Sequence, residues 1–127
     1  MKSYTIVNEY LNFNSHVHVR LHENKGRCVF TSKSFQKGEV ICSNHVLVFT
    51  YDLIKKSELD DFSISWKDEL DCIALGLISF INHSETPNTR IENDYELKLV
   101  KIIALFDIEE NTELTFSYKC GAWFPVC

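Results

Sequence analysis

The sequence predicts a mostly β domain with short helices, and three observations support this fold class. The segment HVHVRLH at 16–22 alternates strictly between polar and apolar residues, as half-buried strands do. Turns at Lys25-Gly26 and Lys37-Gly38 separate short runs of strand-forming residues in the first half of the chain. Strand patterning returns near the C-terminus in YELKLVKIIAL and TELTFSY, which the polar turn DIEENT joins.

Size and composition indicate one globular domain. The chain has 127 residues, the usual size of a single domain, and we expect residues 1–127 to form it. An apolar fraction of 45% and a charged fraction of 24% are typical of globular proteins. The net charge of −5 argues against direct nucleic-acid binding, which normally requires a basic face.

Hydrophobic patterning and cysteine usage predict an intracellular protein. No apolar run reaches the roughly 18 residues that a membrane span needs, and no signal peptide is evident at the N-terminus. The five cysteines include no C-x-x-C pair, which favours reduced thiols in an intracellular compartment.

The strand predicted at 16–22 places Val17, Val19 and Leu21 on its apolar face. His16 and His18 lie on the polar face and could contact one metal ion. However, no carboxylate or cysteine neighbour completes a ligand set, so a solvated strand face is the simpler interpretation.

The middle of the chain changes to a helical period. From Leu70 to Ile81 the apolar residues fall at offsets 0, 3, 4, 7, 8 and 11, which predicts one amphipathic helix over 70–81. Pro87 prevents a simple continuation. The acidic stretch 57–71 before this helix is either a solvated helical face or an acidic rim that attracts a basic peptide.

The segment ISFINHSETPN, where the helical period stops, admits several interpretations. Asn82-His83-Ser84 fits the glycosylation rule, but that rule has meaning only in secreted chains. His83 could bind a metal ion, or the segment could form the floor of a cofactor pocket. In TELTFSY, Leu114, Phe116 and Tyr118 share one face of a strand and, by themselves, indicate a core-facing aromatic pair.

Two segments, SFINHSETPN and ELTFSY, closely resemble the signature motifs of the SET-domain protein lysine methyltransferases. KGRCVFTSKSFQKGEVI is similar to the opening segment of that family, and the resemblance covers roughly residues 15–124. It implies a β-clip-like fold of several small sheets with a C-terminal pseudoknot, where the chain after FINHS crosses the chain around ELTFSY. It also implies S-adenosylmethionine as cofactor, bound on one face and joined by a narrow channel to the target lysine on the other.

Matched position by position, the resemblance implies a role for each site residue. Asn82 would hold the methionine end of the cofactor, and His83 would contribute mainly backbone groups near the adenine. Gly26, together with Arg27 and Cys28, would offer main-chain contacts to the cofactor, because the missing side chain of Gly26 allows close approach. Tyr118 matches the catalytic tyrosine, and Phe116 matches the channel position that tunes how many methyl groups are added.

The implied chemistry requires a neutral lysine, because a charged amine is no nucleophile. The free side chain has a pKa of about 10.4, and both an aromatic channel and a neighbouring sulfonium lower it. Tyr118 is then expected to orient and support the methyl group, since positioning alone can supply several kcal/mol. Phe116 cannot hydrogen-bond the amine, so we expect di- or trimethylation.

Several positions depart from the family pattern. Glu85 stands where many members have a zinc-binding Cys, and the tail holds only Cys120 and Cys127, so we predict no structural zinc. Trp123 and Phe124 would then pack over the pocket, with Trp123 near the cofactor, or be ordinary core or dimer-interface aromatics. In addition, Cys28 replaces a common second Gly and Ser79 a common Arg.

The sequence therefore predicts a minimal SET domain without cysteine-rich flanking modules, acting as an S-adenosylmethionine-dependent protein lysine N-methyltransferase. The partner would be a basic, histone-like protein or peptide, with neither nucleic acid nor membrane, and a homodimer is a further hypothesis. The alternative is a catalytically inactive SET-type module that binds a peptide. A metal hydrolase using His16, His18 and His83 lacks the expected carboxylate spacing.

Overall fold

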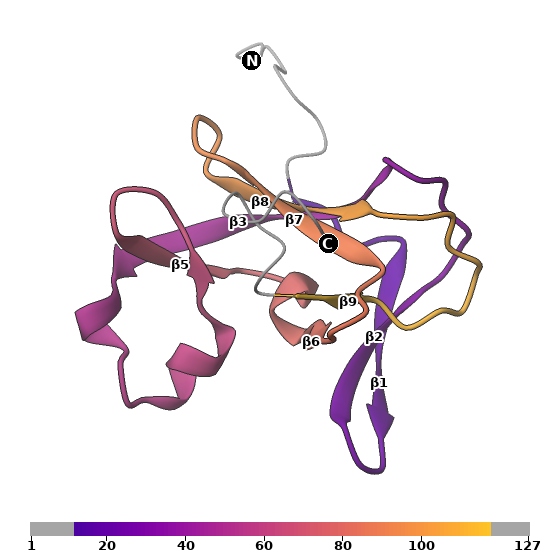
Figure 1. Cartoon of the computed structure of the whole chain (residues 1–127), viewed down its shortest axis with the longest axis horizontal. Coiled ribbons are helices and arrows are strands. Elements are labelled where there is room, and N and C mark those ends of the chain that lie inside the picture. Colours follow the sequence, from indigo (N-terminus) through magenta and orange to yellow (C-terminus); the bar gives the residue numbers. More distant parts are fainter. Residues whose placement is uncertain (1–11, 118–127) are drawn as a thin grey trace, which may run out of the picture.

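The computed structural model describes residues 12–117, and in this range it contains three small β-sheets and three short 3-10 helices (Figure 1). A five-stranded sheet with the order β4-β5-β3-β8-β7 forms the centre. Its strands are β3 (Val40–Thr50), β4 (Ile64–Ser65), β5 (Leu70–Ala74), β7 (Thr89–Asp94) and β8 (Leu99–Ala104). This architecture confirms the predicted fold class, mostly β with short helices.

A two-stranded hairpin formed by β1 (Val17–His22) and β2 (Gly26–Thr31) projects from the body of the molecule (Figure 1). Both strands were predicted, but the predicted burial of one face is wrong for most of β1. Val17 is 7% exposed, whereas Val19 is 36% and Leu21 84% exposed. The reason is that the outer half of the hairpin extends beyond the core and has nothing to pack against.

The core lies against one face of the central sheet. Alternate residues of β3 point into it and face fully buried partners on the neighbouring strands, such as Ile102 opposite Cys42 and Cys72 opposite Val48. Phe35, Trp66 and Leu114 join the same apolar cluster from outside the sheet. The long β3 thus links the strands on both of its sides through one shared core.

The helix predicted over 70–81 is not formed. Residues 70–74 form β5, which pairs antiparallel with β3 from Thr50↔Leu70 to Val46↔Ala74, and a short 3-10 helix, η3 (Leu77–Phe80), follows. Asp68 and Glu69 adopt positive φ values of 56° and 62° and form the tight turn that leads into β5. Pairing with β3 therefore overrides the helical period of the apolar residues.

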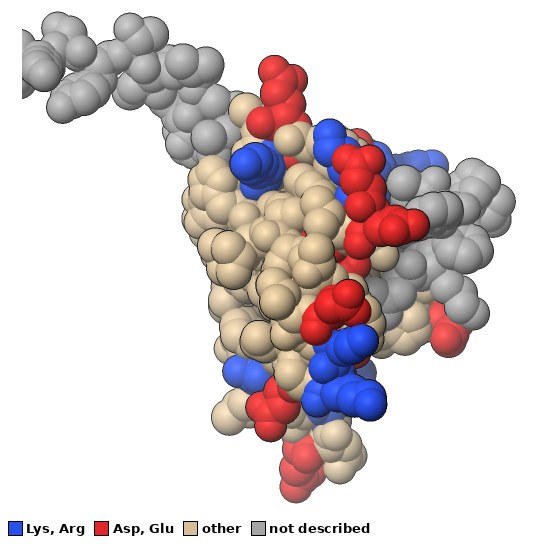
Figure 2. All heavy atoms as spheres, turned by 90° about the vertical axis from the view of Figure 1, so that its left-hand side faces the viewer, with Lys and Arg blue, Asp and Glu red and all other residues tan. Residues whose placement is uncertain are grey.

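The acidic stretch 57–71 is also not a helical face. It passes through η2 (Glu58–Phe62), β4 and the turn into β5, while η1 (Tyr51–Leu53) precedes it. Figure 2 shows this side of the molecule as a broad uncharged surface bordered by acidic and basic residues. None of the helices in residues 12–117 is long and apolar enough to cross a membrane.

The third sheet joins two distant segments of the chain. β6 (Asn82–His83) pairs parallel with β9 (Thr115–Phe116), with Asn82 opposite Thr115 and His83 opposite Phe116. This pairing lies where the two signature segments were expected to cross. The part of the predicted pseudoknot that follows Ser117 lies outside the described residues.

Candidate functional site

Asn82 connects three segments that are far apart in the sequence. Its side-chain nitrogen Nδ2 donates to the Arg27 carbonyl at 3.0 Å, to Glu113 Oε2 at 3.2 Å and to Cys28 Sγ at 3.4 Å. The pairing of β6 with β9 delivers Asn82 to this position, and β2 delivers the other two predicted residues. The structure thus brings together Arg27, Cys28 and Asn82, which the sequence had placed in one site.

Glu113 and Lys25 also belong to this cluster, although the sequence analysis assigned neither a role. Lys25 Nζ lies 2.9 Å from Glu113 Oε1, and the two side chains are 54% and 19% exposed. Burial alone would raise the pKa of Glu113, but hydrogen bonds from Lys25, Asn82 and Cys28, together with the charge of Lys25, outweigh burial and lower it. The signals were present, because Glu113 opens the motif ELTFSY and Lys25 precedes the turn glycine.

Gly26 lies at the start of β2 with a φ of 75°, a backbone conformation that favours glycine. A Cβ atom there would meet nothing within 4 Å, so the space beside it is open. Cys28, by contrast, is 1% exposed, and burial together with the neighbouring Glu113 raises the pKa of its thiol. The cysteine therefore fills the inner side of the turn and leaves the outer side, at Gly26, accessible.

The side chain of Arg27 packs on an aromatic ring. Its guanidinium lies 4.3 Å from the ring centroid of Phe80, and Phe80 meets Phe62 edge-on at 6.3 Å. Phe80 belongs to η3, the element that leads into β6. This contact connects the turn at residues 25–27 to the segment that carries Asn82 and His83, and the Arg27 carbonyl accepts from Asn82.

His83 and Glu85 contact each other. His83 Nε2 lies 3.3 Å from Glu85 Oε1, and their side chains are 37% and 77% exposed. Within residues 12–117 no group of three His, Cys, Asp or Glu side chains is arranged to hold a metal ion. The histidines of the hydrolase alternative have separate surroundings, since His16 packs on Phe35 and His18 stacks on Phe30.

The side chains of Asn88, which ends the ETPN segment, and Thr89, which begins β7, hold β9 in place. Asn88 Nδ2 donates to the Glu113 carbonyl at 2.8 Å, and Asn88 Oδ1 accepts from Thr115 N at 2.9 Å. Thr89, which is fully buried, donates to the Thr115 carbonyl at 2.7 Å. These bonds fix the strand that carries Phe116, itself 4% exposed and packed in the core cluster.

Some predicted residues have other surroundings or lie beyond the described range. Ser79, found where Arg is common, donates its hydroxyl to the Ala74 carbonyl at 2.5 Å. Residues outside the described range include the predicted catalytic and lid residues and two of the cysteines, namely Tyr118, Cys120, Trp123, Phe124 and Cys127.

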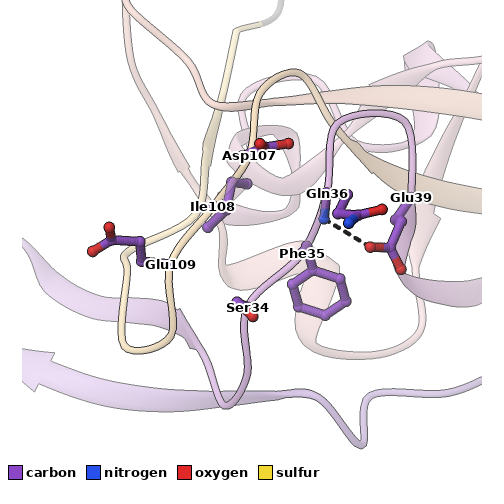
Figure 3. A pocket seen from close by; sticks show the side chains of 7 residues that line it. All are labelled: Ser34, Phe35, Gln36, Glu39, Asp107, Ile108 and Glu109. Atoms are coloured by element: carbon purple, nitrogen blue, oxygen red, sulfur yellow. Dashed lines mark hydrogen bonds between the residues drawn. The ribbon is translucent and has the colours of Figure 1, made fainter.

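A separate shallow cavity of about 450 Å³ contains none of the predicted site residues (Figure 3). It lies between the loops that the Phe35–Ile108 backbone bridge joins, and Glu39 accepts there from the Gln36 amide at 2.7 Å. Its lining consists of Ser34, Phe35, Gln36, Glu39, Asp107, Ile108 and Glu109. Since Asn82 and its partners lie elsewhere, we do not include this cavity in the candidate site.

Comparison with known proteins shows the family to which the chain belongs. The SET domain profile matches residues 26–119, and the chain belongs to the SET domain family. A histone-lysine N-methyltransferase of Schizosaccharomyces pombe, specific for lysine 37 of histone H3, is 29% identical over 114 residues, which span 87% of this chain and 78% of the relative. These findings confirm the predicted family and the predicted enzyme class, a protein-lysine N-methyltransferase.

The fold has a solved counterpart. A crystal structure of a Plasmodium falciparum protein assigned as a histone methyltransferase has a TM-score of 0.68 and 20% sequence identity, and the match covers 80% of this chain and 96% of that one. At this identity the likeness shows the fold alone.

Proposed function

We propose that this chain transfers methyl groups from S-adenosylmethionine to lysine side chains of a basic, histone-like protein. The observation that carries the proposal is the position of Asn82, held against Arg27, Cys28 and Glu113. This arrangement joins the three segments on which the family resemblance was based. The relative that acts on histone H3 supports the choice of substrate class.

The described residues fit the proposed cofactor. Gly26 has open space beside it, and the Asn82 amide is a polar group of the kind that can hold an amino-acid end. We assign the methionine end to Asn82, the adenine edge to the backbone at His83, and main-chain contacts to residues 26–28. When bound, S-adenosylmethionine would supply an activated methyl group on its sulfonium.

The reactive half of the site is assigned to β9 and the residues after it. We propose that Tyr118 orients the lysine nitrogen and that Phe116 borders the channel, with Trp123 covering the cofactor. The hydrogen bonds of Asn88 and Thr89 to β9 would then set the position of Phe116 relative to Asn82. Water would be excluded by the apolar cluster that contains Phe116 and Leu114.

The assignment of Phe116 gives a test of product specificity. A phenyl ring cannot hydrogen-bond the amine, so a methylated nitrogen can turn and react again, and we expect di- and trimethylated products. The change Phe116→Tyr adds a hydroxyl that can hold the amine, and the product should move towards monomethyllysine. Mass spectrometry at saturating cofactor measures this, and exclusive monomethylation by the wild type would contradict it.

The remaining expectations concern the whole chain. We propose that residues 1–127 act as one SET domain, working in the nucleus or cytoplasm where histone-like substrates occur. The proposed homodimer is testable by light scattering, where a mass near the 14.8 kDa of one chain would exclude it. The acidic residues of 57–71 remain a proposed attraction for a basic substrate.

The decisive experiment incubates labelled S-adenosylmethionine with histones and either the wild type or Tyr118→Phe. We expect label transfer by the wild type and its loss in the variant, with cofactor affinity retained. Cofactor binding without transfer to any protein would favour the inactive, peptide-binding alternative. Transfer at the wild-type rate by Tyr118→Phe would remove the proposed role of Tyr118.

A further inference from the structure

We propose that Glu113, held by Lys25, is a positioning residue that fixes which way the side-chain amide of Asn82 faces. The inference deepens the proposed function, because Asn82 is the residue assigned to the amino-acid end of the cofactor. Residues 25–28, Asn82 and Glu113 all lie within the described range.

The orientation follows from the neighbours of the amide. The Arg27 carbonyl and the Glu113 carboxylate lie 3.0 and 3.2 Å from the Asn82 nitrogen, and neither of them can donate a hydrogen bond. Only the NH2 group of Asn82 can therefore face them. A flipped amide would place its oxygen against two other acceptors, so Oδ1 must point to the opposite side.

The charge of Glu113 is essential to this arrangement, because a protonated carboxyl could itself donate and would no longer select the NH2 group. Lys25 helps to keep Glu113 ionised, since its ammonium lies 2.9 Å from Oε1. Burial opposes ionisation of Glu113, and the hydrogen bonds from Lys25, Asn82 and Cys28, together with the charge of Lys25, outweigh it and lower the pKa. Lys25 thus acts on Asn82 through its ion pair with Glu113.

The hairpin β1–β2 places Lys25. Its backbone amide donates to His22 Nδ1 at 3.3 Å, as the Asn24 amide does at 3.1 Å, and the positive φ of Gly26 completes the turn. The exposed hairpin is thereby connected to the cofactor-side residues. The outer half of the hairpin, where Val19 and Leu21 are exposed, would thus contribute by positioning Lys25.

The consequence for ligand binding is specific. An outward-facing Oδ1 is an acceptor for an ammonium group such as the amino-acid end of the cofactor. S-adenosylmethionine and S-adenosylhomocysteine share that end and differ at the sulfur. If Glu113 acts by orienting Asn82, its loss weakens both ligands equally, whereas an attraction to the sulfonium would weaken only S-adenosylmethionine.

Calorimetric affinities of both ligands for four variants test the inference. Glu113→Leu removes the acceptor without adding a positive charge, and it should weaken each ligand about 10- to 100-fold, the usual effect of losing a charge-assisted hydrogen bond. Lys25→Met should weaken each about 2- to 5-fold, because an exposed ion pair contributes little. The matched control is Lys55→Met, which removes a lysine that is also 54% exposed and pairs with Asp52 at 3.2 Å, and it should change nothing.

The fourth variant exchanges the charges, with Lys25→Glu and Glu113→Lys together. If the Lys25–Glu113 ion pair only stabilised the fold, this exchange would restore the pair and with it the ligand affinity. It cannot restore an acceptor for the Asn82 amide, since lysine only donates, so ligand affinity should stay low. Recovery of wild-type affinity in this double variant would overturn the inference.

A readout in the free protein makes the test independent of catalysis. The side-chain amide signals of Asn82 in NMR spectra, assigned with Asn82→Ala, should shift in Lys25→Met and stay in place in Lys55→Met. Unshifted signals with unchanged affinities, or a loss confined to S-adenosylmethionine, would overturn the inference. If both ligands weaken together but the wild type transfers no methyl group to histones, the positioning role holds and the proposed function fails.

Discussion

The central sheet and the β6–β9 crossing are held together by different forces. Four of the five strands of the sheet have five residues or more, and inner side chains such as Ile102 and Cys72 are fully buried. The crossing has strands of two residues each, and side chains of Asn88 and Thr89 supply much of its hydrogen bonding. The hydrophobic effect does not depend on the orientation of the buried groups, whereas a hydrogen bond requires a defined distance and angle. Stability should therefore depend mainly on the sheet, and site geometry on the crossing.

Truncation of the sheet core should have the largest effect on stability. Ile102 is 0% exposed and faces Cys42 and Ile91 on its two neighbouring strands. Ile102→Ala should lower the free energy of unfolding by about 2–5 kcal/mol, and Ile102→Val by about 0.5–1.5 kcal/mol. Urea unfolding measures both, and the folded fraction should bind cofactor as the wild type does. A fall in affinity without a fall in stability would contradict the division between the two regions.

Gly76 gives the next largest effect, at the boundary between sheet and site. A Cβ atom there would lie 2.5 Å from the side chain of Asn44, which is fully buried and accepts from the Ile78 amide at 3.1 Å. Gly76→Ala should cost about 1–3 kcal/mol of unfolding free energy, the usual cost of overpacking. The cost should shrink in an Asn44→Ala background, since the colliding atoms are gone. Equal costs in both backgrounds would show that steric conflict is not the cause.

The positions of several signature residues could be predicted from the sequence because they lie in short motifs, while their roles stay predictions. Residues 26–28 and Asn82 were placed in one site, and the structure does bring Arg27, Cys28 and Asn82 into contact. Glu113 was quoted only as part of a motif, and its partner Lys25 was missed. A contact between residues 88 positions apart leaves no periodic signal in a single sequence.

The errors have physical reasons of the same kind. The apolar residues from 70 to 81 have a helical period, yet residues 70–74 form β5 and pair with β3. A short apolar run fits a strand or a helix equally well, and only the tertiary neighbour decides. The alternation of β1 was read correctly as a strand, but Val19 and Leu21 are exposed because alternation does not reveal where the core ends.

The crossing should respond to a change too small to disturb the sheet. Thr89 is 0% exposed and donates its hydroxyl to the Thr115 carbonyl at 2.7 Å. Thr89→Val keeps the shape and removes this bond, so it should cost about 1–3 kcal/mol and also weaken cofactor binding. Thr89→Ser keeps the hydroxyl and should retain the affinity. If valine and serine variants bind cofactor equally well, the hydrogen bond does not position the site.

The smallest expected effect is in the pH dependence, where one carboxyl from each region should behave oppositely. In the site, Glu113 has a pKa below its ordinary 4.5, because the hydrogen bonds from Lys25, Asn82 and Cys28 and the charge of Lys25 together outweigh burial. In the sheet, burial and the charge of Asp60 raise the pKa of Asp71 above its ordinary 3.8. Because the pKa of Glu113 is lower in the folded protein, the unfolded chain takes up the proton first as the pH falls. Glu113 therefore stabilises the fold above pH 4.5. This stabilisation is lost as the pH falls through the pKa of the folded protein.

For Asp71 the sign reverses. The folded protein binds that proton more tightly, so protonation of Asp71 adds stability as the pH falls through its raised pKa towards 3.8. Urea unfolding between about pH 3 and 7 should therefore show a weaker acid loss in Glu113→Gln than in the wild type. Asp71→Asn should show a steeper one, together with a gain in stability at neutral pH. Parallel curves for all three proteins would mean that neither carboxyl interacts differently in the folded and unfolded states.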